Sequence, residues 1–170
     1  MLQPKPAIAE LKNQWLFQHV NVEFPTPESL AGRELYKQKL AEKTYCQIGT
    51  DVIEHQPLNL DDVYLVDFHR LTVAFSLLQA KQWDNQADQS LVVEFLSQII
   101  YSAPCDLYLA FSGGEAIAAA IVTTSGKELL ISDLSFSSEK FEVLESAFIS
   151  ALVQKTRDSD IDYSDIYREK

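Results

Sequence analysis

A carboxylate that follows a run of apolar residues is the first candidate for chemistry in this sequence. Asp133 comes directly after a segment rich in Leu and Ile, and alternation along a strand places it on one face with Ile131 and, from the neighbouring strand, Ala118. A carboxylate beside small apolar side chains loses hydration, which raises its pKa and lets it act as a general base. The alternative is that Asp133 lies at the rim of the sheet, where it is solvated or caps the next turn.

The residue types that bind metals elsewhere in the chain do not predict a metal site. Asp158, Asp160, Asp162 and Glu169 match ligand positions of a calcium-binding EF-hand loop, but Tyr163 stands where that loop needs glycine. We therefore expect a frayed acidic tail and no calcium. No pair among the remaining candidates has the local spacing of metal ligands: His19, His55, His69, Cys46 and Cys105.

The composition is that of an acidic globular chain, and it excludes several classes of function. The 170 residues suffice for one core of ordinary size. Asp and Glu outnumber Lys and Arg by 25 to 14, and the net charge of −11 opposes binding to nucleic acid or to an anionic membrane surface. No apolar run approaches the roughly 20 residues that cross a bilayer. Two cysteines without CxxC spacing and no secretory leader near Met1 indicate a reduced, cytoplasmic protein.

The segment from Asp106 to Phe136 is predicted to form three antiparallel strands that position Asp133. Gly113-Gly114 suits a two-residue hairpin loop because glycine accepts positive φ, and a second hairpin closes around Ser125-Gly126-Lys127. The loops fix a register that sets large side chains against small ones: Ser112 opposite Glu115, Phe111 opposite Ala116, Leu109 opposite Ala118, and Leu107 opposite Ala120.

Both faces of this sheet are apolar in the predicted register. One face is expected to collect Leu107, Leu109, Phe111, Val122, Leu129 and Ile131. The other is expected to collect Tyr108, Ile117, Ile121, Leu130 and Leu134. A sheet that is apolar on both faces must be covered on both, so we predict an α/β or α+β fold with a mostly antiparallel central sheet and helices on both faces.

The flanking sequence supplies the helices and two further strands. From apolar spacing and capping residues, helices are expected at about 7–17, 26–43, 59–78, 90–103 and 138–155. Strands are expected at 19–24 and 45–53. The chain then divides into an N-terminal extension packed on the core (1–44), the core (45–157) and an acidic C-terminal tail (158–170).

The middle of the chain, roughly residues 46–156, resembles the GCN5-related N-acetyltransferases. The central hairpin of that family is similar to LYLA at 107–110 followed by GEAIAAAIV at 114–122. Its next strand ends in a pattern similar to DLSFSSE at 133–139. The order strand, helix, helix, three strands, helix is also similar.

The resemblance implies an acyl-CoA-dependent N-acyltransferase that acts on a small amine. It implies that the strand carrying Asp133 splays from the next strand, and that the gap holds the acyl-thioester arm of acetyl-CoA or another acyl-CoA. It further implies that Asp133 assists deprotonation of the amine and that Tyr36 protonates the leaving thiolate, although a tyrosine on an amphipathic helix is otherwise a packing residue. The implied cofactor-binding residues are Leu134, Ser135, Phe136, Ser137 and Ser138.

Two features depart from the family pattern. Residues 140–145, KFEVLE, stand where the family has a glycine-rich pyrophosphate loop, and Glu142 and Glu145 would repel a pyrophosphate. The family's strands after the last helix are not recognised, so residues 20–53 or a second subunit are expected to complete the sheet. Two other interpretations therefore stay open: a non-catalytic protein- or ligand-binding module on the same scaffold, or another small α/β adaptor. Monomer and homodimer are both compatible with the sequence.

Overall fold

The fold is α+β and is built on one mixed sheet. The computed structural model describes residues 4–49, 57–137, 142–157 and 163–170. Within them the sheet has six strands in the order β1-β6-β5-β4-β3-β2, and β5 with β6 is the one parallel pair. The predicted fold class is confirmed. The elements in chain order are α1 (Ala7–Phe17), η1 (Gln18–Val20), α2 (Pro27–Leu40), β1 (Tyr45–Gln47), η2 (Leu60–Asp62), β2 (Val63–Leu65), α4 (His69–Ala80), α5 (Gln86–Leu96), β3 (Cys105–Ser112), β4 (Glu115–Ser125), β5 (Glu128–Phe136), α6 (Glu142–Arg157) and β6 (Asp165–Glu169).

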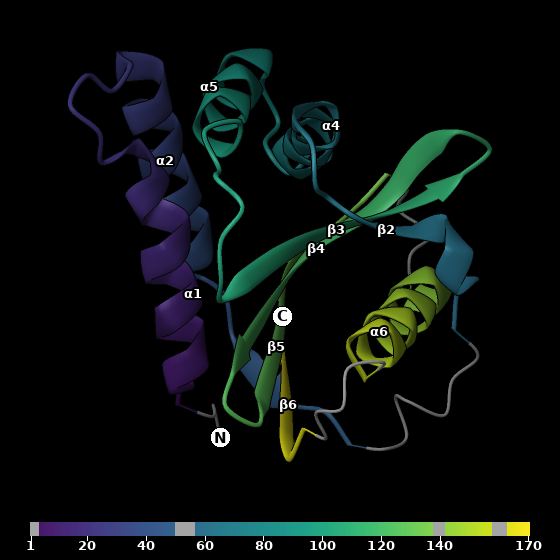
Figure 1. Cartoon of the computed structure of the whole chain (residues 1–170). Coiled ribbons are helices and arrows are strands. Elements are labelled where there is room, and N and C mark those ends of the chain that lie inside the picture. The colour runs from purple at the N-terminus through teal and green to yellow at the C-terminus, as the bar shows by residue number, and fades with distance from the viewer. Residues whose placement is uncertain (1–3, 50–56, 138–141, 158–162) are drawn as a thin grey trace.

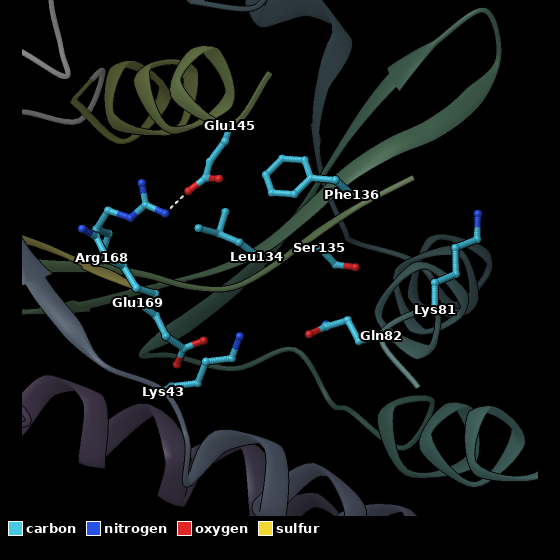
Figure 2. Close-up of a pocket in the computed structure, with 10 residues that line it drawn as sticks. Lys43, Lys81, Gln82, Leu134, Ser135, Phe136, Glu145, Arg168 and Glu169 are labelled. Carbon is cyan, nitrogen blue, oxygen red and sulfur yellow. Dashed lines mark hydrogen bonds and ion pairs between the residues drawn. The ribbon is translucent and has the colours of Figure 1, made fainter. Parts of the chain in front are cut away.

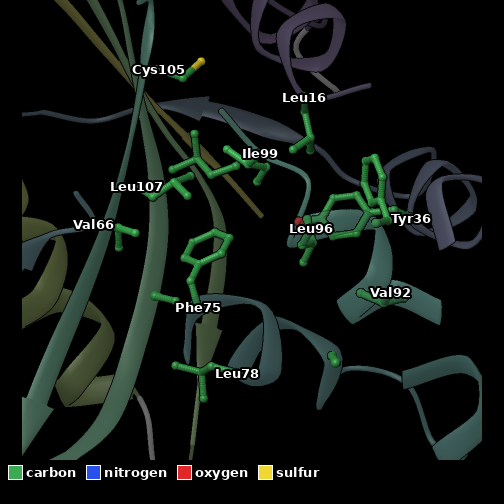
Figure 3. Packing of buried hydrophobic residues seen from close by; sticks show 14 of the residues in the cluster. Leu16, Tyr36, Val66, Phe75, Leu78, Val92, Leu96, Ile99, Cys105 and Leu107 are labelled. Atoms are coloured by element: carbon green, nitrogen blue, oxygen red, sulfur yellow. The ribbon is translucent and has the colours of Figure 1, made fainter. Parts of the chain in front are cut away.

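Helices cover both faces of the sheet, as predicted. Figure 1 shows α6 on one face and α1, α2, α4 and α5 on the other. On the four-helix side, Leu107 and Ile121 pack with Phe75 of α4 and with residues of α1, α2 and α5, as Figure 3 shows in part. On the α6 side, Val122, Leu129 and Ile131 pack with Phe148 and Leu152.

The two central hairpins form, but a bulge alters the predicted register of β3. Ser112 pairs with Glu115 and Phe111 with Ala116 as predicted, and the second loop is Gly126-Lys127. The register then shifts between Ala110 and Phe111, because β4 has one extra residue at Ile117. A shift of one residue moves side chains to the opposite face. The prediction that Leu107 and Leu109 share a face with Val122, Leu129 and Ile131 is therefore wrong, and the observed partners are Leu107 with Ile121 and Leu109 with Ala119.

Three other segments differ from the predicted secondary structure. The helix expected at 90–103 spans Gln86–Leu96 and ends seven residues early. The strand expected at 19–24 is wrong, since the chain there forms the end of η1 and a bend. The helix expected from Asn59 starts ten residues later, at His69. The intervening Val63–Leu65 forms edge strand β2, which pairs with β3, and the Asn59 side chain caps η2 by accepting from the Asp61 N–H at 3.1 Å. Pairing with β3 outweighs the helical spacing of the aromatic residues in this segment.

The C-terminal residues complete the sheet. Asp165–Glu169, expected to belong to a frayed tail, form β6 between β5 and β1. Tyr163 and Ile166 are buried against α6. The expectation of a frayed tail is therefore wrong for these residues, and β1 of the segment 20–53 adds the outermost strand beyond β6. The parts of the predicted strand and tail at 50–53 and 158–162 lie outside the described residues.

Candidate functional site

The site is built where β5 separates from β6. The parallel pairing joins Glu128–Ile131 to Asp165–Arg168 and stops there, although β5 continues to Phe136. At this point β5 carries an extra residue relative to β4, since Ile121 opposes Ser132 whereas Ala119 opposes Ser135. Asp133 lies in this second bulge with a φ of +53°, in the left-handed region that Asp tolerates better than most side chains. Contacts from other elements hold it there.

The side chain of Asp133 is enclosed by three polar partners. Its Oδ1 accepts from the Tyr36 hydroxyl of α2 at 2.5 Å, and its Oδ2 accepts from the Ser132 hydroxyl at 2.6 Å. The ammonium of Lys12, from α1, lies 2.7 Å from Oδ2, and both side chains of this ion pair are fully buried. The two residues that the sequence offered as catalytic, Asp133 and Tyr36, are thus brought into direct contact.

The main chain of Asp133 is held by two further side chains. Its N–H donates to Oε1 of Glu169 at 3.0 Å, and its carbonyl accepts from the Gln79 amide of α4. Glu169 in turn accepts from the Tyr45 hydroxyl at 3.1 Å, and its carboxylate lies 3.8 Å from the Lys12 ammonium. These residues form what we call the buried cluster: Lys12, Tyr36, Tyr45, Gln79, Ser132, Asp133 and Glu169.

The charges of the buried cluster shift one another's pKa values. Burial opposes the charge of Asp133, but Lys12 and the hydroxyls of Ser132 and Tyr36 outweigh it, so the pKa of Asp133 is lowered. The predicted rise in the pKa of Asp133 is therefore wrong. Burial and the nearby Asp133 charge raise the pKa of Glu169. Burial also opposes the charge of Lys12, but the two carboxylates overcome it and raise the pKa of Lys12.

Tyr36 is a buried, protonated phenol. Burial, followed by the Asp133 charge, raises its pKa well above the ordinary value. The residue is 3% exposed, as is Asp133, and its ring packs 5.7 Å from those of Trp83 and Phe95. A small space of about 10 Å³ borders Tyr36, Asp133 and Glu169, so the cluster itself leaves no room for a substrate.

An open pocket of about 400 Å³ adjoins the cluster on the β5–β6 side (Figure 2). We call it the β5–β6 pocket, and it is lined by Lys43, Lys81, Gln82, Leu134, Ser135, Phe136, Glu145, Arg168, Glu169 and Lys170. Four of these side chains are cationic and two are carboxylates, in a chain whose net charge is −11. Glu169 belongs to both the pocket and the buried cluster, and therefore connects them.

The ion pair of Arg168 with Glu145 lies in the wall of this pocket (Figure 2). Glu145 of α6 was expected to repel an anionic ligand, but Arg168 of β6 neutralises it. The cations Lys43, Lys81 and Lys170 then outnumber the remaining carboxylate of Glu169. The lining of the pocket therefore carries a net positive charge, which favours the binding of an anionic group.

The residues predicted to bind a cofactor fall into three groups. Leu134, Ser135 and Phe136 line the β5–β6 pocket, although the hydroxyl of Ser135 donates to the Leu78 carbonyl at 2.9 Å. Ser137 is exposed and is not a lining residue, and its N–H donates to the Ile117 carbonyl at 3.0 Å. Ser138 lies outside the described residues.

Sequence reasoning missed Lys12 and Glu169, which complete the cluster. Lys12 stands one helical turn after Ile8 and is buried with it, so a lysine on the apolar side of α1 was the available signal. Glu169 is buried at the end of a five-residue strand whose only strong strand formers are Ile166 and Tyr167. That segment was too short and too acidic to be recognised as a strand.

Metal and membrane sites receive no support from the described part of the chain. No group of three or more His, Cys, Asp or Glu side chains among the described residues is arranged to hold a metal ion. No helix there combines the length and apolar character needed to cross a membrane.

Comparisons with known proteins find a similar fold and indicate no function. No protein-family model matches this chain, and no curated protein matches it. Among solved structures it is similar to a functionally unknown conserved protein from Staphylococcus epidermidis ATCC 12228, with a TM-score of 0.56 and 11% identity. The match covers 80% of this chain and 55% of that one, so this chain spans little more than half the length of its structural neighbour. At this identity the likeness concerns the fold alone.

Proposed function

We propose that this protein is an acyl-CoA-dependent N-acyltransferase that acts on a small amine, with the acyl-CoA bound in the β5–β6 pocket. The observation that carries the proposal is the separation of the parallel strands β5 and β6 beside a pocket walled by Leu134–Phe136. The arm of coenzyme A contains amide groups, so it can lie along β5 in the direction that β6 leaves. The order from β2 to α6, which is strand, helix, helix, three strands and helix, supports the proposal, although its first strand is Val63–Leu65 and not the one expected at 45–53.

The charges of the pocket support an anionic cofactor. Lys43, Lys81 and Lys170 are available to phosphate groups, and Arg168 offsets Glu145. In this proposal the basic side chains take over the phosphate contacts that a glycine-rich loop makes through its backbone. The absence of glycine from residues 140–145 is then compatible with binding.

The proposed reaction is direct attack of the amine on the thioester carbonyl. The C–N bond forms, the C–S bond breaks, the amine loses a proton and the departing thiolate gains one. Glu169 is the proposed proton acceptor because it borders the pocket and its pKa is raised, whereas Asp133 has a lowered pKa and is paired with Lys12. Asp133 and Tyr36 would then position Glu169 through the Asp133 N–H rather than touch the substrate.

Calorimetric titration with acetyl-CoA and with free coenzyme A, beside melting curves, tests the proposal. At 100 times its dissociation constant the ligand should raise the unfolding free energy by about 2.7 kcal/mol. Lys81→Glu, in the pocket, should weaken binding, whereas the control Lys127→Glu, in the exposed β4–β5 loop, should not. No heat and no shift at millimolar acetyl-CoA would eliminate the acyl-CoA reading.

A non-catalytic binding module on the same scaffold is the second candidate. It is favoured by the burial of Tyr36, Asp133 and Glu169, which are 3%, 3% and 4% exposed, because this burial keeps the predicted catalytic groups and the proposed proton acceptor from direct contact with a substrate. The two functions differ in turnover. Saturable acetyl-CoA binding without acetylation of any of a panel of small primary amines and polyamines would support the module and oppose the enzyme.

A further inference from the structure

A second pocket opens at the tip of the β3–β4 hairpin, and it shares no lining residue with the β5–β6 pocket. Its volume is about 450 Å³. Figure 1 shows this hairpin tip at the far end of the sheet from the β4–β5 turn and β6. We call it the aromatic pocket, and it is lined by Asp62, Tyr64, Phe68, Leu71, Phe111, Gly113 and Gly114.

The register of the sheet brings two aromatic rings to one side of this pocket. Tyr64 of β2 lies opposite Leu109 of β3, so Phe111, two residues further along β3, is its diagonal neighbour on the same face. The two rings meet edge to face, with centroids 5.5 Å apart and planes at 79°. Perpendicular rings form a corner that can contact one small group from two directions.

The remaining lining leaves that corner open. Phe68, directly before α4, contributes a third ring that is 52% exposed, and Tyr64 is 48% exposed. Gly113 and Gly114 contribute no side chain, and a Cβ at either would meet nothing within 4 Å. Three aromatic rings are thus held partly in water around a hollow, where burial by a ligand would remove apolar surface from solvent.

The lining of the aromatic pocket carries one negative charge. Asp62 is the one charged residue among the lining residues that the structure describes. Close by in sequence, two further carboxylates, Asp61 and Asp67, and one cation, Arg70, are exposed. The two cation–π contacts of the described residues use Phe17 and Trp83, so neither occupies these rings. An acidic chain of net charge −11 also attracts cations to its surface.

We infer that the aromatic pocket binds a small alkylated ammonium compound, a quaternary or tertiary amine. The face of an aromatic ring attracts a cation through its quadrupole, and a quaternary ammonium group is bulky, weakly hydrated and unable to donate hydrogen bonds. Three rings and a single carboxylate match that chemistry. A primary ammonium group is strongly hydrated through its three N–H donors, and the three rings offer no hydrogen-bond acceptor to replace that water.

The inference does not depend on acyl-CoA chemistry, because the residues that carry it are separate from the β5–β6 pocket. Its test is a titration of the full chain with choline, in which binding is monitored through the amide signals of Gly113 and Gly114 in NMR spectra. The matched control ligand is 3,3-dimethylbutan-1-ol, which has the shape of choline without its charge. Choline should bind saturably and more tightly than the neutral alcohol. Raising the salt concentration should weaken the binding of choline and leave the binding of the alcohol unchanged.

Phe68→Leu separates cation–π attraction from simple apolar contact. Leucine keeps an apolar side chain at the half-exposed position 68 but removes the ring, so choline affinity should fall roughly three- to thirty-fold. Phe24→Leu is the control, since Phe24 is 85% exposed and lies outside the pocket, and it should leave choline affinity unchanged. Circular dichroism spectra establish that each variant is folded, and Tyr64→Leu replaces Phe68→Leu if the latter is not.

Three results would overturn the inference. The first is the absence of saturation up to about 10 mM choline, which corresponds to negligible affinity. The second is equal affinity for choline and for the neutral alcohol, which would make the pocket a plain apolar hollow. The third is unchanged choline affinity in a folded ring-removal variant.

Discussion

The Tyr36 hydroxyl donates a 2.5 Å hydrogen bond to Oδ1 of Asp133 and so ties helix α2 to the bulge of β5. Both side chains are buried, and both belong to a cluster that also draws in α1, β1 and β6. The contact therefore fixes the geometry of the point where β5 leaves β6, next to the proposed cofactor pocket. Loss of this contact should therefore lower the stability of the fold. It should change activity only by changing the geometry beside the pocket.

Tyr36→Phe should lower the unfolding free energy by about 1–3 kcal/mol, because a buried carboxylate oxygen of Asp133 loses its donor. Urea unfolding monitored by circular dichroism measures this change. If Tyr36 acts by positioning Glu169, Tyr36→Phe should lower the acetylation rate much less in a Glu169→Gln background than in the wild type. If instead Tyr36 donates the proton to the thiolate, the rate should fall by the same factor in both backgrounds, and the positioning assignment fails.

The buried ion pair of Lys12 and Asp133 should behave as a unit. Asp133→Asn keeps a side chain that tolerates positive φ but strands the Lys12 ammonium, so a loss of about 3–5 kcal/mol in unfolding free energy is expected. Lys12→Met should also be strongly destabilising, since it removes the buried cation that lies between Asp133 and Glu169. The double variant Lys12→Met/Asp133→Asn should recover part of the summed loss.

The control for that cycle is the exposed ion pair of Lys5 with Glu10, whose side chains are 44% and 58% exposed. Lys5→Met should change the unfolding free energy by less than about 1 kcal/mol. Strict additivity of Lys12→Met and Asp133→Asn would contradict the coupling that the 2.7 Å contact implies.

Stability should depend on pH through Glu169. Its folded-state pKa is raised above 4.5, so its contribution is fully present below that value and is lost as the pH rises through the folded-state pKa. Glu169→Gln can still accept the Asp133 N–H but does not titrate. The unfolding free energy of the variant should therefore rise relative to that of the wild type as the pH increases above about 4.5. Parallel pH profiles would show that Glu169 has no raised pKa.

Gly32→Ala should destabilise the protein although alanine favours helices. In an isolated helix this change would stabilise by about 1 kcal/mol. Here a Cβ at Gly32 would lie 1.9 Å from the Leu91 carbonyl oxygen and 2.9 Å from Cβ of Phe95, because α2 and α5 pack backbone to backbone. The melting temperature should fall, whereas the control Gln38→Ala on the exposed side of α2 should leave it nearly unchanged. A higher melting temperature for Gly32→Ala would mean that the helices can separate at no cost.

Local signals made the hairpins predictable and left the bulges invisible. Gly113-Gly114 and Gly126 mark their turns because positive φ favours glycine, and each of these glycines has a φ of at least 58°. No residue type in the sequence marks the extra residue at Ile117 of β4. Because this bulge was not predicted, the side chains of Leu107 and Leu109 were assigned to the wrong face of the sheet.

Long-range partners decide the rest of the site, and single-sequence patterns do not carry them. Asp133 was found because a carboxylate ending an apolar strand is unusual, but the direction of its pKa shift depends on Lys12, which arrives from the first helix. Likewise, Tyr64 and Phe68 have the spacing of a helix, and only the edge of β3 makes Tyr64 part of a strand. Chemistry-bearing residues could be guessed one at a time, whereas their grouping is a property of the tertiary fold.

The ion pair of Arg168 with Glu145 should control anion binding in the β5–β6 pocket. Arg168→Gln leaves the Glu145 carboxylate uncompensated in the pocket wall, so acetyl-CoA affinity should fall by at least about tenfold, a loss of roughly 1.4 kcal/mol. In the double variant Arg168→Gln/Glu145→Gln the repulsion is gone, and affinity should recover toward the wild-type value because Lys43 and Lys81 remain. Calorimetric titration at low and at high salt measures both. If the double variant binds acetyl-CoA no better than Arg168→Gln does, the arginine acts by contacting the ligand itself and not by neutralising the charge of Glu145.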